Sequence, residues 1–97
     1  MKVGGYVYIV ANRKNGALYT GVTADIAQRT WQHRERTGSR FAAKHGILRL
    51  VYVEQHDEIE NAIVRGKRIR KWNRAWKIAL IEQSNPDWRD LWFDLNR

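Results

Sequence analysis

The alternation of apolar and polar positions begins with two β-rich runs, Tyr6–Val10 and Leu18–Val22, on either side of Asn15 and Gly16. An Asn-Gly pair between two such runs is the strongest short-range signal for a β-hairpin. We therefore predict a hairpin at the start of the chain, with Asn15 and Gly16 as its turn.

This turn sets a register in which Tyr8 lies opposite Thr23. Because paired residues share a face and successive residues alternate, Tyr8 and Tyr19 then lie on one face with the side-chain-free Gly21 between them. A shift of two residues keeps that arrangement, and a shift of one destroys it. Two phenols beside a glycine could form a reactive surface, or they could be ordinary packing residues of strands.

A helix is predicted to follow the hairpin, capped by Asp25 or by Thr23. Its stripe at helical spacing carries Ile26, Arg29 and His33. Ile26 should anchor the stripe to the sheet and so turn Arg29 and His33, one helical turn apart, toward the hairpin face.

The middle of the chain combines a basic connection with an apolar run. The connection Gly38–Gly46 carries Arg40 and Lys44, which suit contacts with phosphate groups. The run Ile47–Val53 is almost continuously apolar, which predicts a central strand covered on both faces.

A long helix is predicted over residues 58–83, opened by a capping box of Asp57 and Glu60 and with a bend near Trp72. Its inner stripe is Ile59, Ala62, Ile63, Gly66 and Ile69. Gly66 is unusual there, because a glycine inside a helix costs about 1 kcal/mol relative to alanine.

The other faces of this helix are strongly basic. They carry Arg65, Lys67, Arg68, Arg70, Lys71, Arg74 and Lys77. Trp72 and Trp76 lie among these cations. The pattern indicates a strip that follows a phosphate backbone, or alternatively a solvated amphipathic helix. Beyond Pro86, apolar residues from Trp88 to Leu95 recur at helical spacing and predict a short terminal helix.

Composition narrows the class of protein. The 97 residues predict one domain, 1–97, and 18 Lys and Arg against 10 acids give a net charge of +8. That balance favours a polyanionic partner, nucleic acid first and an anionic membrane surface second. The membrane alternative needs an exposed apolar stripe, whereas the apolar stripes here are required by the core. We therefore expect DNA as the partner and no membrane, and the residues identify no protein partner.

Cysteine is absent, which excludes disulfides and thiolate metal sites. No run reaches the roughly 18 apolar residues of a membrane helix, and the N-terminus does not read as a signal peptide. A cytoplasmic location is the expectation that fits.

Taken together, the motif residues resemble the GIY-YIG nuclease domain, in its small standalone branch. The resemblance is carried by Tyr6-Val7-Tyr8, Tyr19-Thr20-Gly21, Arg29 with His33, Ile69-Arg70-Lys71-Trp72, and the tail from Asn85-Pro86-Asp87-Trp88. It implies an α+β fold, an α/β sandwich with a small three-stranded antiparallel sheet flanked by helices. It also implies a DNA endonuclease that hydrolyses phosphodiesters with Mg²⁺ or Mn²⁺.

The resemblance implies catalytic roles for Tyr8, Tyr19, Arg29 and His33. A phenol near a metal can orient or deprotonate the attacking water, and arginine can stabilise the charge that develops on the phosphate. Together with the basic segments, it predicts nucleic-acid contacts from Gly21, Arg40, Lys44, Lys67, Arg70, Lys71, Trp72 and Arg74. Arginines and exposed tryptophans favour single-stranded or branched DNA.

The glutamate that binds the metal in this family falls on Gly66, which supplies no carboxylate. We therefore expect cleavage to be crippled in this chain. Either an inactivating substitution has been introduced into an otherwise intact site, which the rest of the site favours, or the chain is a basic nucleic-acid-binding module that does not cut.

Overall fold

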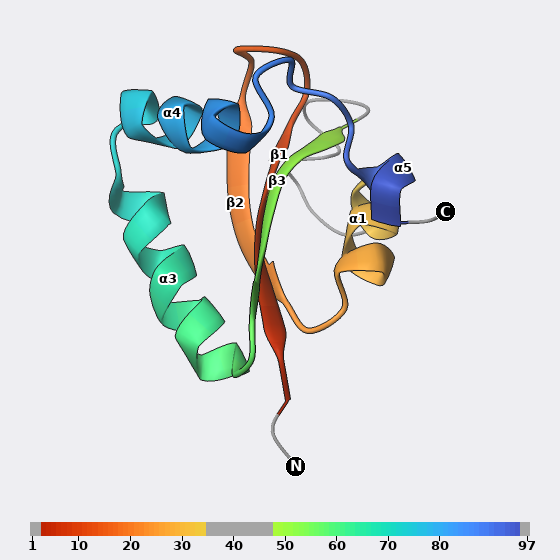
Figure 1. The fold of residues 1–97 in the computed structure, drawn as a ribbon, viewed down its shortest axis with the longest axis vertical. Helices are drawn as coiled ribbons and strands as arrows, with labels where there is room; N and C mark the ends of the chain where they lie inside the picture. Colours follow the sequence, from red (N-terminus) through yellow and green to blue (C-terminus); the bar gives the residue numbers. More distant parts are fainter. Residues whose placement is uncertain (1–2, 35–47, 96–97) are drawn as a thin grey trace.

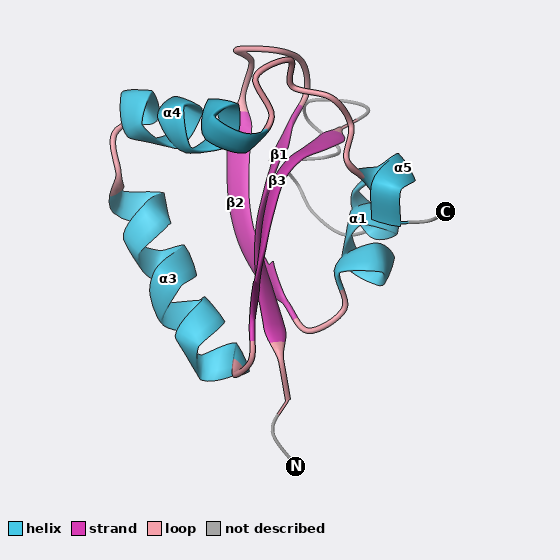
Figure 2. Ribbon diagram, in the orientation of Figure 1, coloured by secondary structure: helices cyan, strands magenta, loops and turns pink. Residues whose placement is uncertain are grey.

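The computed structural model describes residues 3–34 and 48–95, and these form three layers. The elements in chain order are β1 (Gly5–Ala11), β2 (Leu18–Thr23), α1 (Ile26–Arg34), β3 (Arg49–His56), α3 (Ile59–Lys71), α4 (Arg74–Ser84) and α5 (Trp92–Leu95). The antiparallel sheet has α3 and α4 on one face and α1 and α5 on the other (Figures 1 and 2). The predicted α+β class with a three-stranded antiparallel sheet is confirmed.

The order of the strands is β2-β1-β3, so the central strand is β1. The prediction that the Ile47–Val53 run forms the central strand is wrong, because β3 lies at an edge. Its apolar character has another cause: the C-terminal segment crosses its outer side, where the Leu91 amide donates to the Leu50 carbonyl at 2.8 Å. Leu48, Leu50 and Val51 are therefore buried although β3 pairs with a strand on one side only.

The register of the hairpin differs from the prediction by two residues. Tyr8 pairs with Gly21, not with Thr23. The loop is longer than a two-residue turn because the Asn12 side chain accepts a hydrogen bond from the Ala17 amide at 2.9 Å. Since the shift is by two residues, Tyr8 and Tyr19 still share a face, as predicted.

Helix α1 begins at Ile26, and both candidate caps contribute to its start. The Asp25 carboxylate accepts a hydrogen bond from the Gln28 amide at 3.1 Å. The Thr23 hydroxyl accepts one from the Asp25 amide, also at 3.1 Å. The cap by Asp25 is therefore confirmed, and Thr23 orders the residue before the helix.

The predicted long helix is two helices, which meet at Trp72 and Asn73. The prediction of a bend near Trp72 is therefore correct in place but too mild. The break is stabilised locally, because the Asn73 side chain accepts a hydrogen bond from the Trp76 amide at 2.9 Å and caps α4. Figure 1 shows α3 and α4 at an angle over the same face of the sheet.

The start and one inner position of α3 also differ from prediction. The capping box of Asp57 and Glu60 is wrong, because the N-cap is Glu58 and its side chain makes no capping hydrogen bond. Ile63, expected inside, is 40% exposed. The buried face is centred on Ala62, and a neighbouring residue lies about 100° further around the helix.

The two faces of the sheet carry separate apolar clusters. On the α3/α4 face, the cluster is Val7, Ile9, Ala11, Val51, Ala62, Ile69, Ile81 and Trp88. On the α1/α5 face, it is Tyr8, Val10, Ile26, Leu48 and Leu50. The predicted terminal helix from Trp88 is too long, because Trp88 packs on the first face while Leu91 and Trp92 pack on the second. Within residues 3–34 and 48–95, no helix has the length and apolarity needed to cross a membrane.

Candidate active site

The site is built around Tyr8, which lies in the central strand on the α1/α5 face and is 1% exposed. Its strand partner is Gly21. A Cβ atom at position 21 would lie 2.4 Å from both Cζ and Oη of Tyr8. The phenol ring therefore lies directly over the glycine, and the lack of a side chain there is what admits it.

Tyr19 contributes the second phenol from β2. Its ring centroid is 6.4 Å from that of Tyr8, with the ring planes at 46°. Tyr19 is half-buried, whereas Tyr8 is enclosed. The sequence-based prediction that hairpin geometry brings the two tyrosines together agrees with this arrangement.

Arg29 reaches the pair from α1. Its Nε donates a hydrogen bond to the Tyr8 Oη at 3.3 Å. Its Nη1 donates to Oε1 of Gln32 at 3.1 Å, which fixes the guanidinium from its other side. Gln32 was missed in the sequence, although its position three residues after Arg29 on one helix is a usable signal for such a contact.

Burial of Tyr8 and the charges around it shift its pKa in opposite directions. Burial raises the pKa of the Tyr8 phenol above 10.0, and the hydrogen bond from Arg29 and the charges of Arg29 and Arg70 lower it by less. The same hydrogen bond raises the pKa of Arg29. At neutral pH the site therefore presents a neutral phenol and a charged guanidinium.

The side chains of three predicted residues lie outside the described part of the structure. The backbone of His33 belongs to α1, one turn after Arg29, but its side chain lies outside the described part of the structure. Arg40 and Lys44 fall in the segment 35–47, which is also outside the described residues.

Gly66 faces the sheet from α3, as its place on the inner stripe predicts. It lies on the α3/α4 face, against Val22 of β2. A Cβ at position 66 would lie 2.5 Å from Cγ2 of Val22. The position at which the sequence resemblance places the family's glutamate thus lies against a methyl group of Val22, and it approaches β2 from the face opposite to Tyr8.

The described residues do not fit a divalent metal ion. Mg²⁺ is usually held by one or two carboxylates, with water and phosphate oxygens. No group of three His, Cys, Asp or Glu side chains that could hold a metal occurs in residues 3–34 and 48–95. The position of the expected ligand, Gly66, has no carboxylate.

The half-buried carboxylate of Glu54 is engaged in other contacts. It lies on β3, which is separated from β2 by the central strand. It accepts a hydrogen bond from Tyr52, lies 2.6 Å from Nε2 of His56 and pairs with Nε of Arg65 at 3.2 Å. Burial raises the pKa of Glu54, but these three hydrogen bonds outweigh it and the net pKa is lowered.

The predicted basic strip divides into two kinds of residue. Arg70 donates from Nε to the Thr20 carbonyl at 3.0 Å, on the outer edge of β2. Arg74 donates from Nη2 to the carbonyl oxygens of Asn15 and Gly16, at 2.7 and 2.6 Å. Both arginines therefore secure the hairpin, which no sequence signal indicates.

The other predicted contacts, Lys67, Lys71 and Trp72, make no such bond to the hairpin in the described residues. The two lysines are exposed, and Trp72 is half-buried beside Trp76. The lysines are therefore accessible from solution.

A small α+β domain whose hairpin presents two tyrosines to an arginine from the next helix has the architecture that the sequence resemblance implies for a nuclease. Comparison with known families agrees: residues 4–79 match the GIY-YIG catalytic domain. The chain belongs to the GIY-YIG family of nuclease domains.

Three relatives share the name UPF0213 protein. A UPF0213 protein from Staphylococcus saprophyticus is 35% identical over 78 residues, which is 80% of this chain and 94% of the relative. A UPF0213 protein from Staphylococcus aureus is 31% identical over the same shares of the two chains. The solution structure of a UPF0213 protein from Bacillus halodurans is 29% identical, with a TM-score of 0.52 over 82% of this chain and 84% of that one.

Proposed function

We propose that this chain binds single-stranded or branched DNA with a phosphodiester held by Arg29 beside Tyr19, that the enclosed Tyr8 positions Arg29, and that the hydrolytic activity of the chain is strongly reduced. The single observation that carries the proposal is the contact between Arg29 and Tyr8 over Gly21, at 3.3 Å from Nε to Oη. It supports a site in which the enclosed Tyr8 phenol fixes the cation that faces the ligand.

Arg29 is suited to the phosphate itself. A guanidinium remains charged and its fork of donors matches two phosphate oxygens, so it can bind the ground state and stabilise developing negative charge. Gln32 and Tyr8 hold it from two sides. Such orientation lowers the entropic cost of forming the reactive geometry.

Tyr8 acts in this chain as a hydrogen-bonding group. Because burial raises its pKa above 10.0, the phenol keeps its proton at neutral pH. Enclosed in this way, it acts on the ligand through Arg29, whose guanidinium it holds by the hydrogen bond at Oη, and it does not remove a proton from a water molecule. With its proton retained, Tyr8 supplies no base for the nucleophile, which agrees with a strongly reduced hydrolytic activity.

The positive charge around the site favours binding. Arg29 on one face of β2 and Arg70 at its outer edge both act electrostatically on Tyr8. With glycine at position 66, no carboxylate side chain stands there to offset these two charges. We therefore infer that the chain binds DNA without a divalent metal.

The test restores the carboxylate in a form that the packing permits. Because a Cβ at position 66 meets the Val22 methyl group at 2.5 Å, Gly66→Glu is made alone and together with Val22→Ala. Gly66→Gln with Val22→Ala has nearly the same shape but no charge, and Val22→Ala alone is the background. Each protein is incubated with labelled single-stranded, branched or double-stranded DNA in Mg²⁺, Mn²⁺ or EDTA.

We expect cleavage to rise by orders of magnitude in Gly66→Glu/Val22→Ala, with metal only, and not in the glutamine variant. Cleavage by the unchanged chain in EDTA, at the rate that Gly66→Glu/Val22→Ala reaches with metal, would contradict the assignment of position 66. If no variant cuts although all bind, the function is that of a nucleic-acid-binding module that does not cleave DNA. The missing carboxylate at position 66 favours this second function. If none binds DNA, the proposal fails as a whole.

A further inference from the structure

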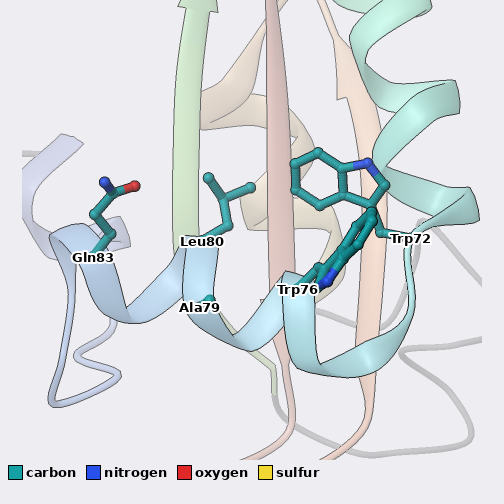
Figure 3. A pocket seen from close by; sticks show the side chains of 5 residues that line it. All are labelled: Trp72, Trp76, Ala79, Leu80 and Gln83. Carbon is teal, nitrogen blue, oxygen red and sulfur yellow. The ribbon is translucent and has the colours of Figure 1, made fainter.

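A groove of about 470 Å³ lies along α4 and at its junction with α3, away from the tyrosine site. It is lined by Trp72, Trp76, Ala79, Leu80 and Gln83. Figure 3 shows the two tryptophans at one end and Gln83 at the other. The groove is shallow and open to solvent, which suits a group that stacks on its surface and does not need to be enclosed.

The tryptophans give the groove two aromatic surfaces. Their ring centroids are 5.9 Å apart and the ring planes meet at 80°. A flat ligand that lies parallel to one ring therefore meets the other at its edge, and both arrangements are favourable for aromatic groups. Trp76 is 59% exposed, so its ring is open to a ligand.

Gln83 adds a polar group at the opposite end. Its amide carries both donors and an acceptor, which match the donor and acceptor pattern on the edge of a nucleobase. The remaining lining, Ala79 and Leu80, is apolar and offers no competing charge. An aromatic, planar ligand with a polar edge fits this combination.

The charge beside the tryptophans is positive. Cζ of Arg65 lies 5.1 Å from the Trp72 ring centroid, although this arginine also pairs with Glu54. Arg68, one helical turn before Trp72, and Lys71, next to it, are exposed. Cations at this end suit the phosphates of a strand whose base enters the groove, whereas an apolar helix of another protein would gain nothing from them.

We infer that the Trp72–Trp76 groove binds an unpaired nucleobase of the DNA strand, by stacking on Trp76. The inference rests on the proposed function, since it adds a second point of contact to the same ligand. It gives a structural reason for preferring single-stranded or branched DNA, because a paired base cannot leave its stack without cost.

The test compares Trp76→Ala and Trp76→Phe with Phe93→Ala. Phe93 is a matched control, because it is also 59% exposed and also lies edge-on to a neighbouring tryptophan, with ring centroids 5.4 Å apart at 86°. Binding is measured in EDTA with a labelled oligothymidine strand and with a strand of the same length made of abasic sites. Thermal unfolding verifies that each variant is folded.

Trp76→Ala should bind the oligothymidine strand roughly 5- to 140-fold more weakly, the range expected for loss of one base–aromatic stack. Trp76→Phe should recover most of that loss. Neither the affinity for the abasic strand nor the salt dependence should change, because no phosphate contact is removed. Phe93→Ala should match the unchanged chain on both strands.

An equal loss on the abasic strand, or a loss no larger than that of Phe93→Ala, would overturn the subsite and leave the proposed function standing. A dimer of the unchanged chain in sedimentation that Trp76→Ala dissociates would show that the groove holds a second copy of the chain instead. Absence of binding by the unchanged chain would overturn the proposed function, and the subsite with it.

Discussion

Replacing Gly21 by alanine tests directly whether the tyrosine site depends on the empty space at that position. The added Cβ would lie 2.4 Å from Cζ and Oη of Tyr8 and 2.8 Å from its Cε1. Tyr8 is 1% exposed, so the ring has no open space into which to move. Position 21 is in a regular strand, and the expected effect is therefore one of close contact and not of strand geometry.

Overpacking of this kind typically destabilises a protein by about 1–3 kcal/mol. For a domain of this size, each kcal/mol lowers Tm by roughly 4–8 °C. We expect Gly21→Ala to lower Tm accordingly in thermal unfolding followed by circular dichroism. Displacement of the phenol should also break its contact with Arg29, so DNA affinity should fall under conditions where the variant is folded.

A double-mutant cycle identifies the source of the loss. Tyr8→Leu removes the three ring atoms that meet the new Cβ while it keeps an apolar side chain in the core. In that background Gly21→Ala should cost much less than in the unchanged chain. The same cost in both backgrounds would refute the argument that Gly21 exists to admit the Tyr8 ring.

Arg70→Ala should weaken binding of single-stranded DNA and reduce the slope of log affinity against log salt by about 0.7, the value for one phosphate contact. Substitution of the exposed Arg89 by alanine should change neither the affinity nor the slope. An unchanged slope together with a lower Tm would show that Arg70 is purely structural. Glu54 has a lowered pKa, so it stabilises the fold above pH 4.5, and that stability is lost as the pH falls through the lowered value. Urea unfolding of Glu54→Gln should show lower stability at pH 7 and a flatter acid limb of stability against pH. An acid limb identical to that of the unchanged chain would contradict the pairing of Glu54. Burial raises the pKa of Tyr52 to about 12, so its contribution to the free energy of unfolding is present below pH 10.0 and is lost between pH 10.0 and about 12. Tyr52→Phe should therefore flatten the alkaline limb of stability against pH. An unchanged alkaline midpoint in this variant would disprove the assignment.

The sequence predicts those parts of the fold that depend on local pattern. The hairpin and the cap by Asp25 follow from residue types close together in the chain, and the inward position of Gly66 follows from the 3.6-residue period; all three agree with the structure. The position of Tyr8 and Tyr19 on one face depends only on parity, so that prediction agrees with the structure although the register is shifted by two.

What the sequence does not predict depends on contacts between distant segments. The apolar run of β3 cannot reveal that its outer side is covered by the backbone at Leu91 instead of a strand. Arg70 and Arg74 look like free cations in the sequence, because an arginine bonded to a distant carbonyl leaves no local signal. The lack of space at Gly66 depends on Val22, which is far away in the chain.

That last contact connects the packing of the fold to the balance between binding and cleavage. A carboxylate at position 66 would need space that Val22 occupies, and it would place a negative charge on the flank of α3 that carries Arg70 one turn later. In metal-free buffer this charge opposes Arg29 and Arg70, so it should repel the DNA phosphates that those arginines attract. Gly66→Glu/Val22→Ala should therefore bind DNA more weakly in EDTA than Val22→Ala does, while Gly66→Gln/Val22→Ala should not. Equal affinity of all three in EDTA would place position 66 outside the field of the site, and the loss of cleavage would then need a cause other than the missing carboxylate.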